Sequence, residues 1–181
     1  MRAAQDGERA ALDTLLRRHY DRLYALCRRM TGDDADAADA CQEALMAIVR
    51  GLPGFDGRSA FGTGADRVTT TACLDELRRR RRRPEPGLPE GSAEVPAPDD
   101  AVEGLTTRLD LDQALQSLPA DYRAAVVLRY WYDYSYTEIA DILDTTESAI
   151  KSRLFRARQM LSDKLHSQEA PGSLTALLEN A

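Results

Sequence analysis

Residues 84–104 are the segment that most limits how this chain can fold. They include five of the eight prolines in the sequence and six acidic side chains, and they include no basic residue. Because proline has no amide donor and like charges repel one another, such a segment does not build a packed core. We therefore predict a flexible acidic linker between a domain at residues 1–83 and a second domain at residues 105–165, followed by a tail at residues 166–181.

Apolar residues on both sides of this linker recur at intervals of three and four positions, the period of an amphipathic helix. In the first domain the pattern predicts three helices, at residues 12–30, about 34–50 and about 65–82. In the second domain it predicts four helices, at residues 109–118, 122–131, 136–143 and 147–165. No segment shows the alternation that is typical of a β-strand. The predicted fold class is all-α, with two small helical domains.

The net charge of −6 for the whole chain argues against a nucleic-acid partner. Counted segment by segment, the charge no longer supports that argument. The linker alone carries −6, while residues 1–83 carry +3 and residues 105–181 carry −3. Six consecutive arginines at residues 78–83 end the third predicted helix, where aligned guanidinium groups could bind several phosphates. A solubilising or localising run is the alternative interpretation.

Several classes of protein do not fit the sequence. The three cysteines and two histidines lack metal-ligand spacing, and there is no Ser/His/Asp set or glycine-rich phosphate loop. We therefore expect no metal, no cofactor, no small-molecule substrate and no catalytic residue, so the chain is not an enzyme. No apolar run approaches the ~20 residues that cross a bilayer, and the N-terminus has no secretory segment. We expect a cytoplasmic protein that does not insert into membranes.

The last two predicted helices carry the most specific motif. A helix of about eight residues, a turn at residues 144–146 and a longer basic helix form a helix-turn-helix arrangement. In the longer helix, Ile150, Leu154, Ala157 and Leu161 share one apolar face. Its basic and polar side chains are thereby left to reach base edges or phosphates in a DNA major groove. A charged helix that only faces solvent is the alternative.

A loop at residues 55–63 (FDGRSAFGT) is a weaker candidate. Its glycines allow unusual backbone angles, and Phe55 and Phe61 can anchor its ends. An exposed polar loop beside a basic helix can hold an unstacked base, although a purely structural connection is the default interpretation of a lone loop.

Together these segments resemble the extracytoplasmic-function (ECF, group 4) sigma factors of bacterial RNA polymerase. DADAADACQEALMAIVR resembles sigma region 2.2, and FDGRSAFGT followed by ACLDELRRRRRR resembles regions 2.3 and 2.4. LPADYRAAVVLRYWYDYSYTEIADILDTTESAIKSRLFRARQML resembles region 4. The matches span roughly residues 8–165 in the family's order. The resemblance implies a protein that binds core RNA polymerase and promoter DNA to initiate transcription, and an anti-sigma factor that holds it inactive, as in many members.

The resemblance also implies three groups of site residues. Binding to core polymerase would use a polar face of the second helix, formed by Asp39, Gln42, Glu43 and Met46. Recognition of the −10 element and capture of a flipped base would use Phe55, Gly57, Arg58, Ser59, Phe61, Thr63, Arg67, Thr71, Arg78 and Arg79. Recognition of the −35 element would use Glu147, Ser148, Lys151, Ser152, Phe155 and Arg156. The acidic linker would thread toward the polymerase active site.

The chain departs from the family's pattern in both domains. Gly64-Ala65-Asp66 stands where the family usually has a tryptophan and an apolar pair, and Thr71 stands where asparagine is frequent. Since glycine and β-branched residues are poor helix formers, we expect the first turns of the third helix to be its weakest part. The sequence leaves open whether this departure impairs promoter melting. In the turn at residues 144–146, Asp144 stands where the family usually has glycine. Because aspartate tolerates a left-handed backbone, we expect this turn to form.

Two other functions fit the residues. One is a helix-turn-helix regulator that binds DNA without polymerase. The other is a sigma-like module that binds proteins but no longer melts promoters, for which Gly64-Ala65-Asp66 is the motivation.

Overall fold

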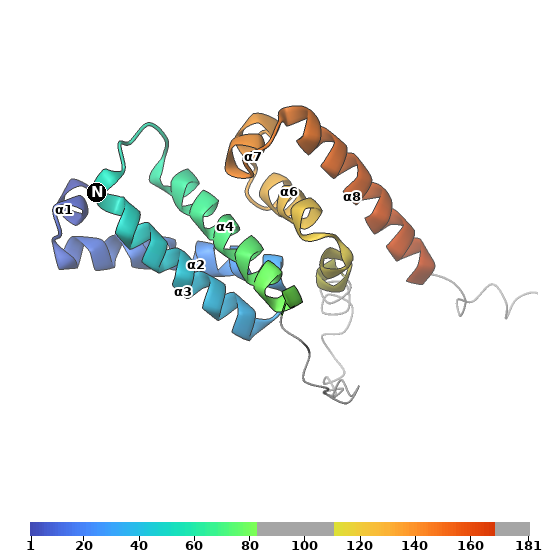
Figure 1. The fold of residues 1–181 in the computed structure, drawn as a ribbon, viewed down its shortest axis with the longest axis horizontal. Coiled ribbons are helices and arrows are strands. Elements are labelled where there is room, and N and C mark those ends of the chain that lie inside the picture. Colours follow the sequence, from blue (N-terminus) through green and yellow to red (C-terminus); the bar gives the residue numbers. More distant parts are fainter. Residues whose placement is uncertain (83–110, 169–181) are drawn as a thin grey trace, which may run out of the picture.

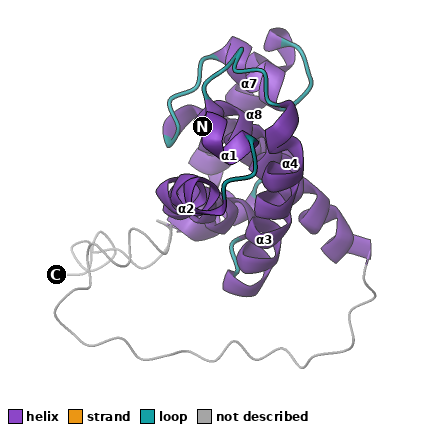
Figure 2. Ribbon diagram, turned by 90° about the vertical axis from the view of Figure 1, so that its left-hand side faces the viewer, coloured by secondary structure: helices purple, strands orange, loops and turns teal. Residues whose placement is uncertain are grey.

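The computed structural model describes residues 1–82 and 111–168 of the chain. Within these ranges every regular element is a helix, which confirms the all-α fold class (Figures 1 and 2). The predicted linker at residues 84–104 lies outside the described residues, as does the chain after residue 168.

The first domain is a bundle of three long helices, and a short helix precedes them in the sequence. Its elements are α1 (Arg2–Gln5), α2 (Arg9–Thr31), α3 (Asp34–Gly51), the 3-10 turn η1 (Leu52–Gly54) and α4 (Phe61–Arg82). The apolar stripe of α2 is buried in its C-terminal half, as Leu23, Leu26, Cys27 and Met30 are at most 1% exposed. On α3 the inner face is buried at Ala37, Cys41 and Ile48 and partly buried at Leu45.

The boundary between α2 and α3 follows from local chemistry. Gly32 ends α2 with a left-handed φ of 78°, a conformation that glycine adopts without steric cost. Asp33 then caps α3, because its carboxylate accepts hydrogen bonds from the backbone N–H groups of Ala35 (2.9 Å) and Asp36 (3.0 Å). These N–H groups lower the pKa of Asp33.

The predicted start of the third helix is wrong by four residues. Helix α4 begins at Phe61 rather than near residue 65, so the loop covers only residues 55–60. The first turns of α4 are helical despite Gly62 and Gly64, because this helix packs against both α2 and α3. Tertiary packing here outweighs the low helix propensity of the segment.

Helix α1 had no counterpart in the sequence pattern. The side-chain amide of Gln5 donates to the carbonyl oxygens of Leu52 (3.2 Å) and Phe55 (2.7 Å). The N-terminal segment therefore holds the connection that leads from α3 into the loop.

The second domain is a smaller bundle. Residues 111–117 are helical and are followed by α6 (Ala120–Tyr130), α7 (Tyr136–Ile142) and α8 (Glu147–Gln168). A capping box between Ser135 and Glu138 starts α7. The turn between α7 and α8 places Asp144 at φ 48°, which confirms the left-handed backbone expected there. The core of this domain is built from residues of all four helices, including Leu115, Leu128, Ile139 and Leu154.

The two domains contact each other directly. Helix α6 lies against α2 and α4 (Figure 1). Ala124 and Val127 of α6 join a buried cluster with Cys27, Met30 and Cys73 of the first domain. The sequence pattern did not predict this contact.

Candidate nucleic-acid interface

Helix α8 separates an apolar face from a polar one, as its sequence predicted. Ile150, Leu154 and Ala157 are at most 1% exposed and pack into the core of the second domain. The predicted DNA-reading side chains lie on the exposed faces: Glu147, Ser148, Lys151, Ser152, Phe155 and Arg156. The ring of Phe155 is 57% exposed.

The first turn of α8 holds Lys151 in place. Its ammonium group lies 2.6 Å from a carboxylate oxygen of Glu147 and 5.9 Å from the centroid of the Tyr136 ring. Glu147 also accepts a hydrogen bond of 3.1 Å from Thr137 of α7. The ion pair raises the pKa of Lys151 and lowers the pKa of Glu147. Because both side chains are exposed, a phosphate can replace the carboxylate at little energetic cost.

The loop at residues 55–60 has anchored ends and an exposed tip. Phe55 and Phe61 meet edge to face with ring centroids 6.0 Å apart, and His19 of α2 packs on Phe61 at 5.0 Å. At the tip, Gly57 has a φ of 73°, and Asp56 pairs with the exposed side chain of Arg58. The backbone N–H and guanidinium of Arg58 lower the pKa of Asp56.

A hollow of about 350 Å³ opens beneath this loop. Its walls include both phenylalanines, Ser59, Ala47, Gly64 and Val68. Of the −10 residues predicted in the loop, Phe61 and Thr63 lie in the first turn of α4. The hollow combines aromatic edges with polar groups, which suits the face and rim of a nucleobase.

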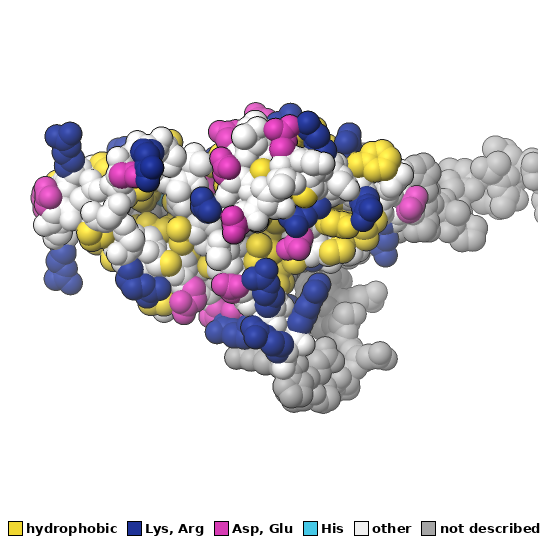
Figure 3. Space-filling view, turned by 45° about the horizontal axis from the view of Figure 1, so that its top comes forward, with side chains coloured by type: hydrophobic (Ala, Val, Ile, Leu, Met, Phe, Trp, Pro, Cys, Tyr) yellow, Lys and Arg dark blue, Asp and Glu magenta, His cyan; other side chains and the backbone are white. Residues whose placement is uncertain are grey.

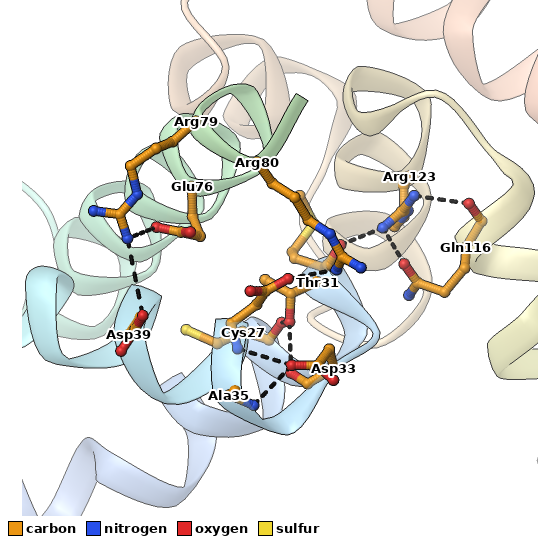
Figure 4. Close-up of polar contacts among 12 residues, drawn as sticks. Cys27, Thr31, Asp33, Ala35, Asp39, Glu76, Arg79, Arg80, Gln116 and Arg123 are labelled. Carbon is orange, nitrogen blue, oxygen red and sulfur yellow. Dashed lines mark hydrogen bonds and ion pairs between the residues drawn. The ribbon is translucent and has the colours of Figure 1, made fainter. Parts of the chain in front are cut away.

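The arginine run does not form a free cationic array over the residues that the structure describes. Arg78 pairs with Asp75 at 2.9 Å, and Arg80 pairs with Asp36 of α3 at 2.5 Å. Arg79 pairs with Glu76 and approaches Asp39 of α3 at 3.9 Å (Figure 4). Three of the arginines at the end of α4 thus pair with carboxylates of the same domain, while their own side chains stay 47–62% exposed.

A groove of about 660 Å³ runs between α3 and α4. Glu43 of α3 lines it together with Arg67, Thr71 and Arg79 of α4. The predicted polymerase-binding residues are all exposed: Asp39, Gln42, Glu43 and Met46. The groove therefore joins side chains that the resemblance assigned to polymerase with side chains that it assigned to DNA.

The two candidate DNA-contacting segments lie at one edge of the molecule. The loop before α4 and the turn before α8 both lie at the top of the two ribbon views (Figures 1 and 2). On the face shown in Figure 3, basic and acidic side chains alternate rather than form one positive surface.

Three buried charges were missed from the sequence. Asp66 is 0% exposed and Glu76 is 7% exposed. Arg123 on α6 is also buried. One signal was available: Asp66, Thr70 and Cys73 share a helical stripe, so the aspartate lies on the buried side of α4.

The described residues were compared with what a metal centre and a membrane-spanning helix require. No group of three or more His, Cys, Asp or Glu side chains among them is arranged to hold a metal ion. None of the described helices is both long and apolar enough to cross a membrane.

The fold and these surfaces define a two-domain helical protein with a C-terminal helix-turn-helix. The family model for sigma-70 region 2 matches residues 15–83, and that for sigma-70 region 4 matches residues 108–161. The ECF RNA polymerase sigma factor SigE of Mycolicibacterium smegmatis is 39% identical over 176 residues, covering 92% of this chain and 68% of the relative. The SigM factor of Mycobacterium tuberculosis is 35% identical over 156 residues, covering 86% and 78%.

A solved sigma-factor structure has a similar fold. The sigma factor RpoE from Bartonella quintana, in complex with the anti-sigma factor NepR, matches with a TM-score of 0.68 and 25% identity. The match covers 85% of this chain and 96% of that chain. The chain therefore belongs to the ECF RNA polymerase sigma factors, which are transcription initiation factors.

Proposed function

We propose that this sigma factor binds core RNA polymerase and reads a −10 and a −35 promoter element with its first and second domains. The observation that carries the proposal is helix α8, where Lys151, Phe155 and Arg156 are exposed opposite a fully buried apolar face. A helix presented in this way fits the width of the DNA major groove.

The second domain is the proposed reader of the −35 element. Lys151 and Arg156 supply charged donors for guanine edges or phosphates, and Ser152 supplies a hydroxyl group. Phe155 supplies an apolar contact, for example to a thymine methyl group. Glu147 and Ser148 lie at the start of the same helix.

The first domain is the proposed site of −10 recognition and strand opening. Arg58 and Ser59 at the exposed loop tip would contact the displaced strand, and the hollow beneath the loop would hold one unstacked base. Stacking on an aromatic ring contributes about 1–3 kcal/mol per base, so capture of a base can stabilise opened DNA without covalent chemistry. Because α4 is helical from Phe61 onward, the departure at Gly64-Ala65-Asp66 leaves this loop anchored.

Core polymerase is the proposed partner of the α3 face. Asp39, Gln42 and Glu43 offer exposed acceptors, and the exposed Met46 offers an apolar contact. With both domains held on polymerase, two weak DNA contacts become one bivalent interaction, so the spacing of the elements contributes to specificity. The acidic linker at residues 84–104 joins the two readers.

Regulation by a further protein belongs to the same proposal. RpoE of B. quintana was solved with an anti-sigma factor, and we infer that this chain also binds one. The chain would act in the cytoplasm, without enzymatic activity, cofactor or metal.

In vitro transcription with core polymerase tests the proposal. The intact chain should initiate at a promoter with both elements, and the double variant Lys151→Ala/Arg156→Ala should lose most of that activity. Arg17→Ala is a matched control, because Arg17 is an exposed arginine on α2 that pairs with Asp13. No initiation by the intact chain, or equal activity of the double variant, would contradict the proposal.

A gel-shift experiment separates this function from its rivals. A regulator that needs no polymerase should bind duplex promoter DNA tightly by itself, whereas the proposed sigma factor should bind weakly until core polymerase is added. A protein-binding module would associate with polymerase but form no open complexes, which permanganate reactivity of unpaired thymines detects.

A further inference from the structure

The short N-terminal helix α1 lies against the connection between α3 and the loop at residues 55–60. Figure 1 shows α1 beside the C-terminal end of α3, where it contacts η1. A helix of four residues is not stable by itself, so these contacts hold α1 in place. Ala4 is 5% exposed, so one side of α1 is buried. The match to sigma-70 region 2 begins at residue 15 and assigns no role to this segment.

Gln5 joins α1 to the connection by two hydrogen bonds. Its side-chain amide donates to the carbonyl oxygen of Leu52 at 3.2 Å and to that of Phe55 at 2.7 Å. The backbone N–H of Phe55 donates to the same carbonyl oxygen of Leu52 at 3.1 Å. An amide nitrogen has two donors and a carbonyl oxygen has two lone pairs, so all three bonds can form together. Both backbone polar groups of Phe55 are therefore bound.

The ring of Phe55 is held by α4. It meets the ring of Phe61 edge to face, with centroids 6.0 Å apart. A Cβ atom at Gly64 would lie 3.6 Å from the Phe55 ring, so this ring rests close to the backbone of α4. His19 of α2 packs on Phe61 at 5.0 Å and supports the pair from below. The backbone of Phe55 is thus fixed by α1 and its ring by α4.

Phe55 lies where the fixed connection passes into the exposed tip of the loop. Its ring lines the hollow of about 350 Å³ that is the proposed site of an unstacked base. The residues that follow, 56–60, are all exposed. An aromatic surface that is already ordered binds a base without the entropic cost of ordering that surface first. The affinity of the hollow for a base therefore depends on what fixes Phe55.

We propose that Gln5 is a positioning residue for base capture. Through its two hydrogen bonds it fixes the backbone at Phe55, and it thereby holds the aromatic wall of the hollow in the position that stacks on a base. Gln5 does not itself line the hollow among the residues that the structure describes. This inference rests on the proposed function, because it assigns base capture to this hollow.

Three substitutions separate the hydrogen bonds of Gln5 from the size of its side chain. Gln5→Ala removes the side chain beyond Cβ. Gln5→Glu keeps the shape but, when ionised, offers acceptors to two carbonyl oxygens and no donor. Gln5→Lys keeps donors at the end of a flexible chain, so it should restore the bonds.

Binding of pre-opened promoter DNA by the complex of the full-length chain with core polymerase tests the role. Abasic sites placed along the displaced −10 strand identify the captured base, and the readout is the ratio of the affinities for the intact and the abasic template. In the wild type the ratio should be about tenfold, as for one stacked base. Gln5→Ala and Gln5→Glu should reduce the ratio about fivefold, as for one lost hydrogen bond, and Gln5→Lys should restore it. The added charge of the lysine acts on both templates and cancels in the ratio.

Cys41→Ala is the control for a general loss of stability. Cys41 is 2% exposed and lies in the core cluster of the first domain, and it is not among the described residues that line the hollow. This variant should unfold at a lower temperature but keep the wild-type ratio of affinities. An equal loss of the ratio in Cys41→Ala and Gln5→Ala would overturn the proposal, because a merely stabilising role predicts that result.

Fluorine NMR tests the position of the ring without DNA or polymerase. The chain has three phenylalanines, so a chain labelled with 4-fluorophenylalanine gives three signals, which single Phe→Leu variants assign. In Gln5→Ala and Gln5→Glu the Phe55 signal should move toward that of the free amino acid, while the Phe155 signal on α8 stays in place. An unchanged Phe55 signal in both variants would overturn the proposal.

Failure of the positioning role and failure of the proposed function give different results. If the wild type binds intact and abasic templates equally at every −10 position, base capture is wrong and the positioning role is wrong with it. If the wild type prefers the intact template and Gln5→Ala and Gln5→Glu keep the same ratio, base capture stands and only the role of Gln5 is overturned.

Discussion

The hydroxyl group of Tyr134 donates a hydrogen bond to the buried carboxylate of Asp66, which lies 68 positions earlier in the sequence. This bond joins the two domains of the sigma factor at a position where both partners are shielded from water. It places a negative charge inside the molecule, with Arg22 as its counter-ion. The stability of the contact between the domains depends on this cluster.

Removing that hydroxyl group should weaken the folded chain. Tyr134→Phe keeps the ring in the core of the second domain but leaves Asp66 with Arg22 alone, so the free energy of unfolding should fall by about 1–3 kcal/mol. Urea denaturation followed by circular dichroism measures this change. Tyr122→Phe serves as the control and should change stability by less than about 0.5 kcal/mol; equal losses in both variants would contradict the prediction.

Truncation of two adjacent residues of α8 should change different properties, stability in one case and DNA affinity in the other. Leu154→Ala removes a side chain that is 1% exposed and should destabilise the chain by about 2–5 kcal/mol. Phe155→Ala removes an exposed ring and should leave stability nearly unchanged, while it lowers affinity for a −35 element in complex with polymerase by about tenfold. Thermal unfolding and filter binding measure the two effects, and a stable Leu154→Ala or a fully active Phe155→Ala would argue against the assigned faces.

Substitutions at Gly32 and Gln116 should have non-additive effects on the free energy of unfolding. Gly32→Ala introduces a side chain at a left-handed φ of 78°, at about 1–2 kcal/mol, and also forces Gln116 away from α2. Gln116→Ala loses its bond to Arg29 but opens space beside Gly32. The double variant should therefore be more stable than the sum of the single changes predicts, by about 0.5–3 kcal/mol. Urea denaturation of all four proteins tests this, and strict additivity would exclude the clash.

Burial should make His19 harder to protonate. Its imidazole packs edge-on against Phe61, and desolvation lowers its pKa below the ordinary 6.5. Above pH 6.5 the group is neutral in both the folded and the unfolded chain, so it does not alter stability. Below pH 6.5 the unfolded chain binds the proton first, so the free energy of unfolding should decrease until the lower folded pKa is passed.

The pKa of His19 can be measured by NMR titration of its ring protons in the intact chain. In His19→Gln, the part of the acid sensitivity that falls just below pH 6.5 should disappear from urea denaturation curves. A pKa at or above 6.5 in the folded chain would contradict the prediction.

The helix-turn-helix was largely predictable because its signals are local. The spacing of Ile150, Leu154 and Ala157 predicted the buried face of α8, and the exposed face follows from the same period. Asp144 predicted the left-handed turn through its own tolerance of that backbone. The start of α4 was not predictable in this way, because Gly62 and Gly64 are poor helix formers that only packing holds in a helix.

Sequence alone therefore determined the long helices, the division into two domains and the surface of α8, since helical periodicity and turn chemistry depend on neighbours within a few residues. Tertiary structure alone decided that Asp66 is buried, that Arg80 pairs with Asp36 and that α6 rests on α2. Each of these depends on a partner from another helix. The energy of burying a charge becomes favourable only when that partner lies within hydrogen-bonding distance.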